Sequence, residues 1–220
     1  MSRKQFAILG MGRFGSAVGR TLASMGHDVL VVDSDEDRIN EIANDVTHAL
    51  IMDIADEESI RQLGLSNFDV VIVGVGHDLQ ASIMAVVLAK EAGAKYVVAK
   101  ATDDLHAKIL KKVGADRIVM PEKDMGVRLA QKLVSNNVLD FIELSKDYSF
   151  TDMQCPNKWV GKTLRQLDLR AHYGANVVAL CSNSNEMDIS PAPDRPLQQG
   201  DRLIFIAPTD MVEKMDHMLG

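Results

Sequence analysis

Three glycines near the start of the chain have the spacing of a turn that binds a pyrophosphate. The segment Gly10-Met-Gly-Arg-Phe-Gly15 directly follows an apolar run and opens a helical pattern. In such a turn Gly10 permits the tight bend, Gly12 lets the backbone approach the phosphates, and Gly15 lets helix and strand pack closely. The amides of the helix N-terminus then face the anion. The spacing predicts a nucleotide site, and glycines that serve only a tight turn are the alternative.

A carboxylate follows the second apolar run, where a ribose would lie. Asp33 follows the glycine turn by about 20 residues, which is the separation typical of dinucleotide-binding proteins. Its carboxylate can accept hydrogen bonds from ribose hydroxyls and would repel a 2′-phosphate. The residue therefore disfavours NADP as a ligand.

Further candidate residues follow the later apolar runs. Asp53 and Ile54 follow the third run, where an adenine usually lies, Gly74 and Gly76 follow the fourth, and Lys100 follows the fifth. Ligands of open α/β sheets bind outside these carboxyl ends of the strands. Asp53 as a helix N-cap and Lys100 as a solvated side chain are the alternatives.

Arg13 places a cation inside the glycine turn. A guanidinium at the first helical turn can reach a terminal phosphate, including one bound to a neighbouring subunit. A solvent-facing arginine is the alternative.

Residues arranged for catalysis do not stand out. The six histidines lack metal-ligand spacing, no GxSxG occurs, and neither Cys155 nor Cys181 belongs to a CxxC pair. The pattern favours a nucleotide sensor that is not an enzyme. A small NAD-dependent oxidoreductase with His77 or Lys100 as proton donor is the alternative from another class.

The elements that must position these residues alternate along the first 121 residues. Apolar runs at 6–9, 29–32, 49–52, 70–75, 96–99 and 117–120 are separated by helical patterns. The runs are continuous, as in parallel strands that are covered on both faces. They predict an α/β fold with a Rossmann-like doubly wound parallel sheet.

After Pro121 the pattern changes to that of a small α+β unit. We expect helices over 122–136, 163–169 and 210–219, and strands over 141–144, 148–153, 176–180, 187–190 and 202–206. These elements predict a nucleotide-binding domain over 1–136 and a second domain over 137–220.

The composition of the chain limits which partners it is expected to bind and in which cell compartment it is expected to work. The formal net charge is −7 and no run of Lys and Arg exceeds two residues, which disfavours binding to nucleic acid. The aliphatic runs are far shorter than the ~20 residues of a membrane span, and the N-terminus lacks the apolar stretch of a signal peptide. The sequence therefore predicts a cytoplasmic protein.

Several stretches together resemble one family over about residues 4–218. They include KQFAILGMGRFGSAVGRTL, LGLSNFDVVIVGVGHDLQASI, GADRIVMPEKDMG, LRQLDLRAHYGANVVAL and LQQGDRLIFIAP. The chain resembles the RCK (KTN) family, the cytosolic gating subunits of bacterial Ktr and Trk potassium uptake systems, and within it the Ktr type. GADRIVMPEKDMG is not a general feature of Rossmann folds.

The resemblance implies an RCK N-lobe followed by an α+β RCK C-lobe. Such proteins form homodimers that assemble into an octameric ring on a membrane-embedded K⁺-translocating subunit. The chain would then be cytoplasmic and peripherally associated with the inner face of the cell membrane. ATP would activate the ring and ADP inactivate it, with NAD(H) as a further occupant of the crevice. A free-standing nucleotide-binding protein is a third hypothesis.

The resemblance also implies roles for individual residues. The phosphate loop would comprise Gly10, Gly12, Arg13, Phe14 and Gly15. Asp33 and Asp35 would lie on the ribose side, and Asp53 and Ile54 on the adenine side. Lys100 would lie near the phosphates. Arg13 would contact the terminal phosphate across the dimer. Glu122 would bind Mg²⁺, Ca²⁺ or Na⁺ between two nucleotides, whereas by itself it is a helix-start acid favoured by the helix dipole.

In the second domain the resemblance implies a site for cyclic di-AMP, which would inhibit transport. Arg170 would meet a phosphate, Asn176 an adenine edge, and Val177 and Pro191 an adenine face. An ordinary strand with a packed loop is the alternative.

Overall fold

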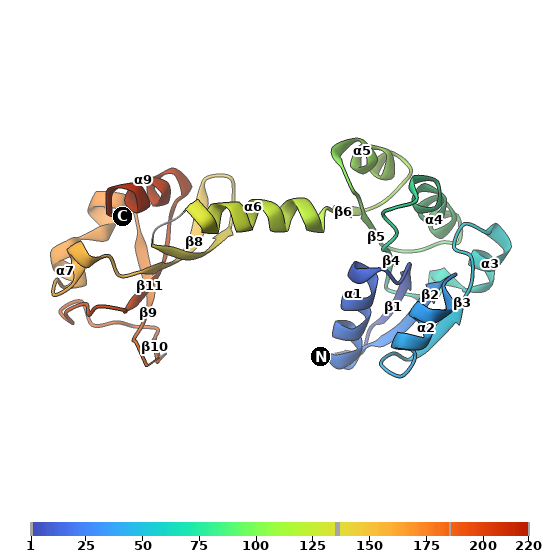
Figure 1. Ribbon diagram of the computed structural model, residues 1–220, viewed down its shortest axis with the longest axis horizontal. Helices are drawn as coiled ribbons and strands as arrows, with labels where there is room; N and C mark the ends of the chain where they lie inside the picture. Colours follow the sequence, from blue (N-terminus) through green and yellow to red (C-terminus); the bar gives the residue numbers. More distant parts are fainter. Residues whose placement is uncertain (1, 135–136, 185, 220) are drawn as a thin grey trace. The chain divides into compact units, whose positions relative to one another are not determined.

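The computed structural model describes residues 2–134, 137–184 and 186–219 (Figure 1). The chain divides into two compact units, Met1–Asp124 and Met125–Gly220, and each unit holds one sheet. The predicted boundary near residue 136 lies outside the described residues, so it stays a prediction.

The first unit is built on a parallel sheet with strand order β3-β2-β1-β4-β5-β6. Its strands are β1 (Gln5–Leu9), β2 (Asp28–Asp33), β3 (His48–Ile51), β4 (Val70–Val73), β5 (Val97–Lys100) and β6 (Arg117–Val119). Its helices are α1 (Arg13–Ser24), α2 (Glu36–Ile42), α3 (Glu57–Gln62), α4 (Leu79–Glu91) and α5 (Asp104–Lys112), with a 3₁₀ turn at Leu65–Asn67. The order confirms the predicted doubly wound sheet and sets its switch point between β1 and β4.

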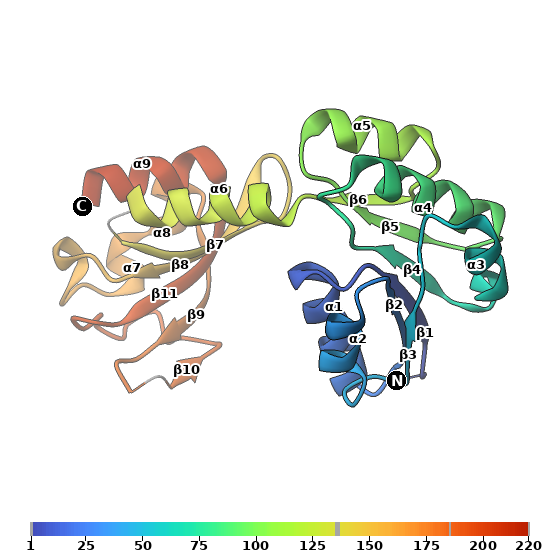
Figure 2. The same ribbon diagram turned by 45° about the vertical axis from the view of Figure 1, so that its right-hand side comes forward.

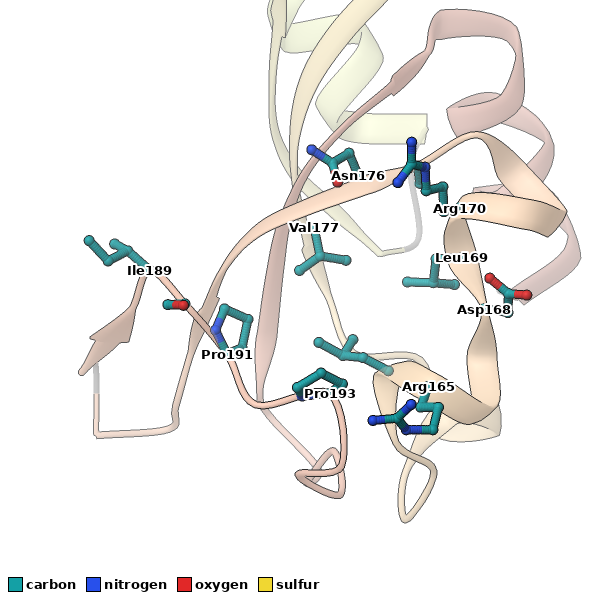
Figure 3. A pocket seen from close by; sticks show the side chains of 12 residues that line it. Arg165, Asp168, Leu169, Arg170, Asn176, Val177, Ile189, Pro191 and Pro193 are labelled. Atoms are coloured by element: carbon teal, nitrogen blue, oxygen red, sulfur yellow. The ribbon is translucent and has the colours of Figure 1, made fainter.

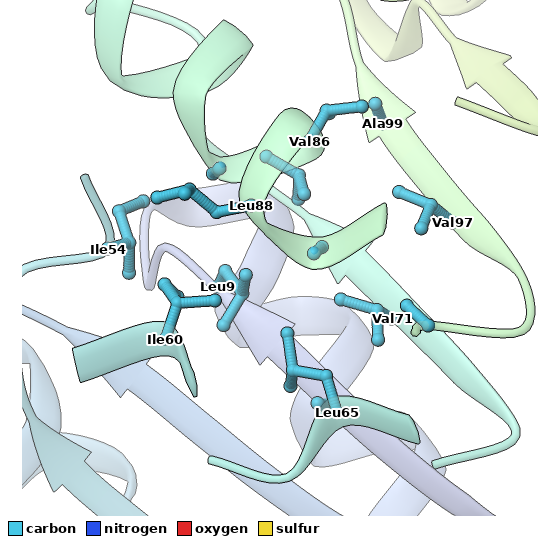
Figure 4. Close-up of a cluster of buried hydrophobic side chains, with 14 of the residues drawn as sticks. Leu9, Ile54, Ile60, Leu65, Val71, Val86, Leu88, Val97 and Ala99 are labelled. Atoms are coloured by element: carbon cyan, nitrogen blue, oxygen red, sulfur yellow. The ribbon is translucent and has the colours of Figure 1, made fainter. Parts of the chain in front are cut away.

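The continuous apolar runs arise because both faces of this sheet are covered. Successive side chains of a strand point to opposite faces. In β1, Leu9 belongs to a cluster with residues of α3, α4 and α5 (Figure 4), whereas Ile8 belongs to a cluster with residues of α1 and α2. Figure 2 shows α1 and α2 on one side of the sheet and α3 and α4 on the other. Leu9, Ile8, Ile42, Ile60 and Leu65 are fully buried. Each such side chain contributes about 1.5–3 kcal/mol to stability through its burial.

The second unit contains an antiparallel sheet with strand order β10-β9-β11-β8-β7. Its strands are β7 (Val138–Glu143), β8 (Tyr148–Gln154), β9 (Asn176–Cys181), β10 (Met187–Asp188) and β11 (Arg202–Pro208). Its helices include α7 (Leu164–Leu167), α8 (Leu169–Tyr173) and α9 (Thr209–Leu219), with a 3₁₀ turn at Asn157–Trp159. Helix α6 (Pro121–Val134) crosses the division between the units. The predicted α+β class is confirmed.

The predicted helix over 163–169 is wrong in one respect, because the chain forms two short helices there. Asp168 separates them with a left-handed backbone, φ 38°. Its carboxylate accepts a hydrogen bond from the amide of Ala171 and so caps the start of α8. The bend turns α8 to a new direction and, as described below, shapes a pocket.

Three glycines let two loops of the first unit touch through their backbones. Gly10 has a φ of +100°, which favours glycine. A Cβ on Gly74 would lie 2.9 Å from the carbonyl oxygen of Gly10, and a Cβ on Gly15 would overlap the same oxygen. The turn between β1 and α1 is therefore pressed against the end of β4 with no room for side chains.

We expect Gly15→Ala to destabilise the first unit by about 1–3 kcal/mol, because the added methyl must displace the Gly10 carbonyl. Urea unfolding followed by circular dichroism measures the change. Fluorescence of Trp159, which is buried in the second unit and is the sole tryptophan of the chain, reports that unit separately.

Gly126→Ala is the control for a helical glycine without close neighbours. Gly126 lies in the second unit, a Cβ there meets nothing within 4 Å, and alanine stabilises a helix interior by about 0.5–1 kcal/mol, so the first unit is expected to keep its stability. Equal stability of the Gly15→Ala variant and the unsubstituted protein would contradict the packing argument.

Candidate functional site

The carboxyl ends of β1, β4 and β5 bring the predicted nucleotide-site residues to one edge of the sheet. The glycine turn follows β1, Gly74 and Gly76 follow β4, and Lys100 ends β5. Helix α1 begins at Arg13, and no side chain caps it. Its first amides and its positive dipole end are therefore suited to an anion.

Asp33 ties the glycine turn to the end of β2. One of its carboxylate oxygens accepts a hydrogen bond from the Met11 amide at 2.5 Å, and the other accepts from the Asp35 amide at 2.9 Å. Each oxygen keeps a second lone pair, so the predicted contact with a ribose is compatible with these bonds. Sequence reasoning missed that Asp33 also holds the turn in place.

Sequence reasoning also did not identify Arg38 as a residue of the candidate site. Its guanidinium lies 3.6 Å from the carboxylate of Asp33 and 3.1 Å from that of Asp35. Asp35 itself caps α2 by accepting bonds from the amides of Asp37 and Arg38. The spacing of an arginine five residues after Asp33 was the available signal.

The adenine-side candidates lie after β3. Asp53 accepts a hydrogen bond from the Ala55 amide at 2.9 Å, and the N-cap of α3 is Asp56. The alternative reading of Asp53 as the helix cap is therefore wrong. Ile54 is buried in the hydrophobic core, so its side chain supplies packing, and its contact with an adenine stays a prediction.

Lys100 pairs with Glu122 at the same edge. Its Nζ donates to Glu122 Oε1 at 2.7 Å, and the lysine side chain is only 11% exposed, whereas the glutamate is 68% exposed. The reading of Lys100 as a solvated lysine is therefore wrong. The hydrogen bond from Lys100 holds the pKa of Glu122 below its usual range, with smaller help from its own amide and from the charge of Arg13.

The loop after β4 completes the surroundings of Lys100. A Cβ on Gly76 would lie 3.4 Å from Lys100 Cε and 3.3 Å from Thr102 Cγ2. Phe14, by contrast, is partly buried and packs its side chain against the core cluster that includes residues of β1, β2 and α2. His77, a proton donor in the oxidoreductase hypothesis, is exposed in the loop between β4 and α4.

A metal ion at Glu122 requires ligands besides this carboxylate. Within the residues that the structure describes, no three His, Cys, Asp or Glu side chains form a metal cluster. A hard cation such as Mg²⁺ is often held by one or two carboxylates together with phosphate oxygens. Glu122 fits this donor set only when a nucleotide supplies the phosphates.

The second unit contains a pocket of about 650 Å³ between α7, α8, β9 and the loop 189–193 (Figure 3). Four of its lining residues are those predicted for a dinucleotide, namely Arg170, Asn176, Val177 and Pro191. These residues therefore line one hollow, and their contact with a dinucleotide stays a prediction. The prediction missed Arg165, which also lines the pocket and forms a two-pronged ion pair with Asp194 at 2.7 and 3.1 Å.

Comparison with known proteins first shows which domain types and which fold the chain resembles. Residues 6–121 match the TrkA-N domain and residues 156–220 match the TrkA-C domain. The RCK domain of GsuK has a similar fold, with a TM-score of 0.69 at 15% identity, over all of this chain and 48% of that one.

Proteins of similar sequence define the family of this chain more closely. The chain is 42% identical to the Ktr system potassium uptake protein C of Bacillus subtilis (strain 168), over 97% of this chain and 96% of that protein. It is 40% identical to the Ktr system potassium uptake protein A of Vibrio alginolyticus, over 94% of each. The chain therefore belongs to the TrkA-N/TrkA-C family of Ktr and Trk potassium uptake proteins, which confirms the resemblance. Every helix in the described part of the chain is too short or too polar to span a bilayer.

We expect Lys100→Met to raise the pKa of Glu122 towards its usual value, because the main hydrogen bond to the carboxylate is lost. NMR titration of the glutamate side-chain carboxyl carbons measures this shift. Lys123→Met is the control, since Lys123 pairs with Asp104 instead. An unchanged pKa of Glu122 in Lys100→Met would contradict the pairing.

Proposed function

We propose that the chain is a nucleotide-sensing regulatory subunit of a Ktr-type K⁺ transporter and has no catalytic activity of its own. The observation that carries the proposal is the uncapped start of α1 at Arg13, together with the pair of Lys100 and Glu122, on whose carboxylate the charge of Arg13 also acts. Cations beside a helix N-terminus suit a polyphosphate, and a carboxylate beside them suits a metal-bound one. The kinship with Ktr proteins supports the transporter as the system that is regulated.

ATP and ADP would be distinguished by the terminal phosphate. Arg13 is exposed at the first turn of α1, so its guanidinium is free to reach beyond the phosphates that the α1 amides hold. ATP adds one phosphate and further negative charge at that position. A charged hydrogen bond of this kind contributes about 1.5–3 kcal/mol. ATP would favour the active state and ADP the inactive one, because each shifts the equilibrium by its differential affinity.

Mg²⁺, Ca²⁺ or Na⁺ would bind at Glu122 together with the phosphates. NAD(H) would occupy the same crevice as a further ligand, with Asp33 at a ribose. GsuK, a channel of similar fold, has been solved bound to NAD. The structure of this chain supports the site through Asp33, whose carboxylate lies at the end of β2 with lone pairs to spare.

Self-association would use α6. Apolar side chains on this helix are exposed, among them Met125, Val127, Leu129 and Leu133, which is 75% exposed. A second copy of the helix would cover them and so form a homodimer. Four such dimers would make an octameric ring at the cytoplasmic face of the membrane subunit.

Cyclic di-AMP would bind in the pocket of the second unit and inhibit transport. Arg170 is exposed at the rim and forms no ion pair among the described residues, so its charge is available for a phosphate. Val177 and Pro191 offer apolar surface to an adenine, and Asn176 offers an amide to its edge.

Arg13→Ala is expected to weaken ATP binding about 10–100-fold and ADP binding much less, because only ATP has the phosphate that Arg13 would reach. Isothermal titration measures both affinities. In vesicles that contain a Ktr membrane subunit, the same variant is expected to abolish the difference in K⁺ flux between ATP and ADP.

Arg20→Ala is the matched control on the same helix. Arg20 pairs with Asp45 away from the glycine turn, so both affinities are expected to stay unchanged. Equal losses of ATP and ADP affinity in Arg13→Ala would refute phosphate sensing. Flux that is independent of the added chain would refute the regulatory role.

Arg170→Ala is expected to weaken cyclic di-AMP binding at least about tenfold, through loss of a charged contact with a phosphate. Lys162→Ala, an exposed cation of the same unit that does not line the pocket, controls for charge alone. Titration of each purified variant measures binding. Equal affinities in the two variants would place the dinucleotide elsewhere.

A further inference from the structure

A buried histidine lies beside the nucleotide site, and the proposed function gives it no role. His106 is on α5 and is 2% exposed. Ser82, on α4, is fully buried against it, and its Oγ lies 3.2 Å from His106 Nε2. A buried polar side chain lowers stability unless it is hydrogen-bonded, so each polar atom in this group needs a partner.

The hydrogen bonds of the ring define its protonation. The Thr102 amide donates to His106 Nδ1 at 3.3 Å, and the Thr102 hydroxyl is 3.2 Å from the same nitrogen. An amide can only donate, so Nδ1 accepts and carries no proton. The proton of the neutral ring is then on Nε2, which donates to Ser82 Oγ. The imidazole thus joins α4, α5 and the segment after β5.

That segment is part of the candidate site. Thr102 follows Lys100 by two residues, and its Cγ2 packs where a side chain on Gly76 would be. β6 holds the backbone of Lys100, but the lysine side chain lies with Thr102 beside Gly76, so a shift of Thr102 changes the packing around Lys100 and its pair with Glu122.

Few charges act on the ring. Asp103 caps α5 by accepting a bond from the His106 amide, and its charge favours the imidazolium. α4 presents the uncharged Ser82 and the segment after β5 presents the uncharged Thr102. The nearby cation Lys100 is paired with Glu122. Burial outweighs Asp103 and lowers the pKa of His106 below its usual value.

We propose that His106 is a positioning residue that holds the end of β5 in its nucleotide-binding arrangement only while the imidazole is neutral, so that acid weakens nucleotide affinity. The inference rests on the proposed function. Protonation places an N–H on Nδ1 opposite the Thr102 amide N–H. The charged ring can still donate to the Thr102 hydroxyl, but the bond from the amide is lost.

The direction of the pH dependence follows from linkage. Well above pH 6.5, about the ordinary pKa of a histidine, the ring is neutral even without burial, and affinity is at its maximum. As the pH falls through the lowered pKa of His106, the ring charges and affinity falls. Loss of one hydrogen bond corresponds to a change of about fivefold. By reciprocity, a bound nucleotide lowers the pKa of His106 further.

The test is the dissociation constant of ADP between pH 5 and 8 for the unsubstituted chain, His106→Gln and His48→Gln. A glutamine amide can accept from Thr102 and donate to Ser82 but does not titrate, so His106→Gln is expected to bind ADP at pH 7.5 and to lose the fivefold acid effect. His48 is exposed on β3, and its variant is expected to keep that effect. The β-phosphate of ADP titrates alike in all three proteins and cancels in the comparison.

Identical pH profiles for the unsubstituted chain and His106→Gln overturn the proposal. Should His106→Gln fail to fold, NMR titration of the His106 ring in the unsubstituted chain decides it. A pKa that ADP lowers supports the proposal, and a pKa that ADP leaves unchanged overturns it. Absence of ADP binding at pH 7.5 in the unsubstituted chain is a different result, because it refutes the proposed function itself.

Discussion

The backbone contact among Gly10, Gly15 and Gly74 is the constraint on which the site depends. It presses the turn before α1 against the end of β4, so the N-terminus of α1 lies at the switch point of the sheet. Asp33 adds a second tie through the Met11 amide. The anion-binding end of the helix is therefore fixed by packing and by one buried carboxylate, before any ligand contributes.

The charged side chains at the site form an ion pair instead of a cluster of unpaired cations. Lys100 is largely buried, and Glu122 compensates for the cost of its desolvation. Arg13 stays exposed at the helix start. Under the proposed function, a phosphate would compete with Glu122 for Lys100 and release the carboxylate for a metal ion. Anion and cation binding would then be coupled, which is what a sensor of nucleotide charge requires.

The second unit offers a different kind of recognition. Its pocket has an exposed arginine at the rim and apolar walls that include Val177 and Pro191. Such a lining suits a flat base with a phosphate beside it. Under the proposed function, two units with separate ligands would allow separate inputs to one transporter, and the family to which the chain belongs serves potassium uptake.

The sequence by itself determined the doubly wound sheet and the glycine turn, because burial on both faces and the turn's steric demands leave local signatures at β1 to β6. It also placed Arg170, Asn176, Val177 and Pro191 in one group, through family resemblance. Only the tertiary structure decided the pairing of Lys100 with Glu122, the cap of α3 at Asp56 and the break at Asp168. It alone revealed the network of His106 with Ser82 and Thr102. The pair of Lys100 with Glu122 and the contact of His106 with Ser82 join residues that are 22 and 24 positions apart, whereas the contact with Thr102, the cap and the break depend on local side-chain hydrogen bonds. Periodicity and spacing encode none of these contacts.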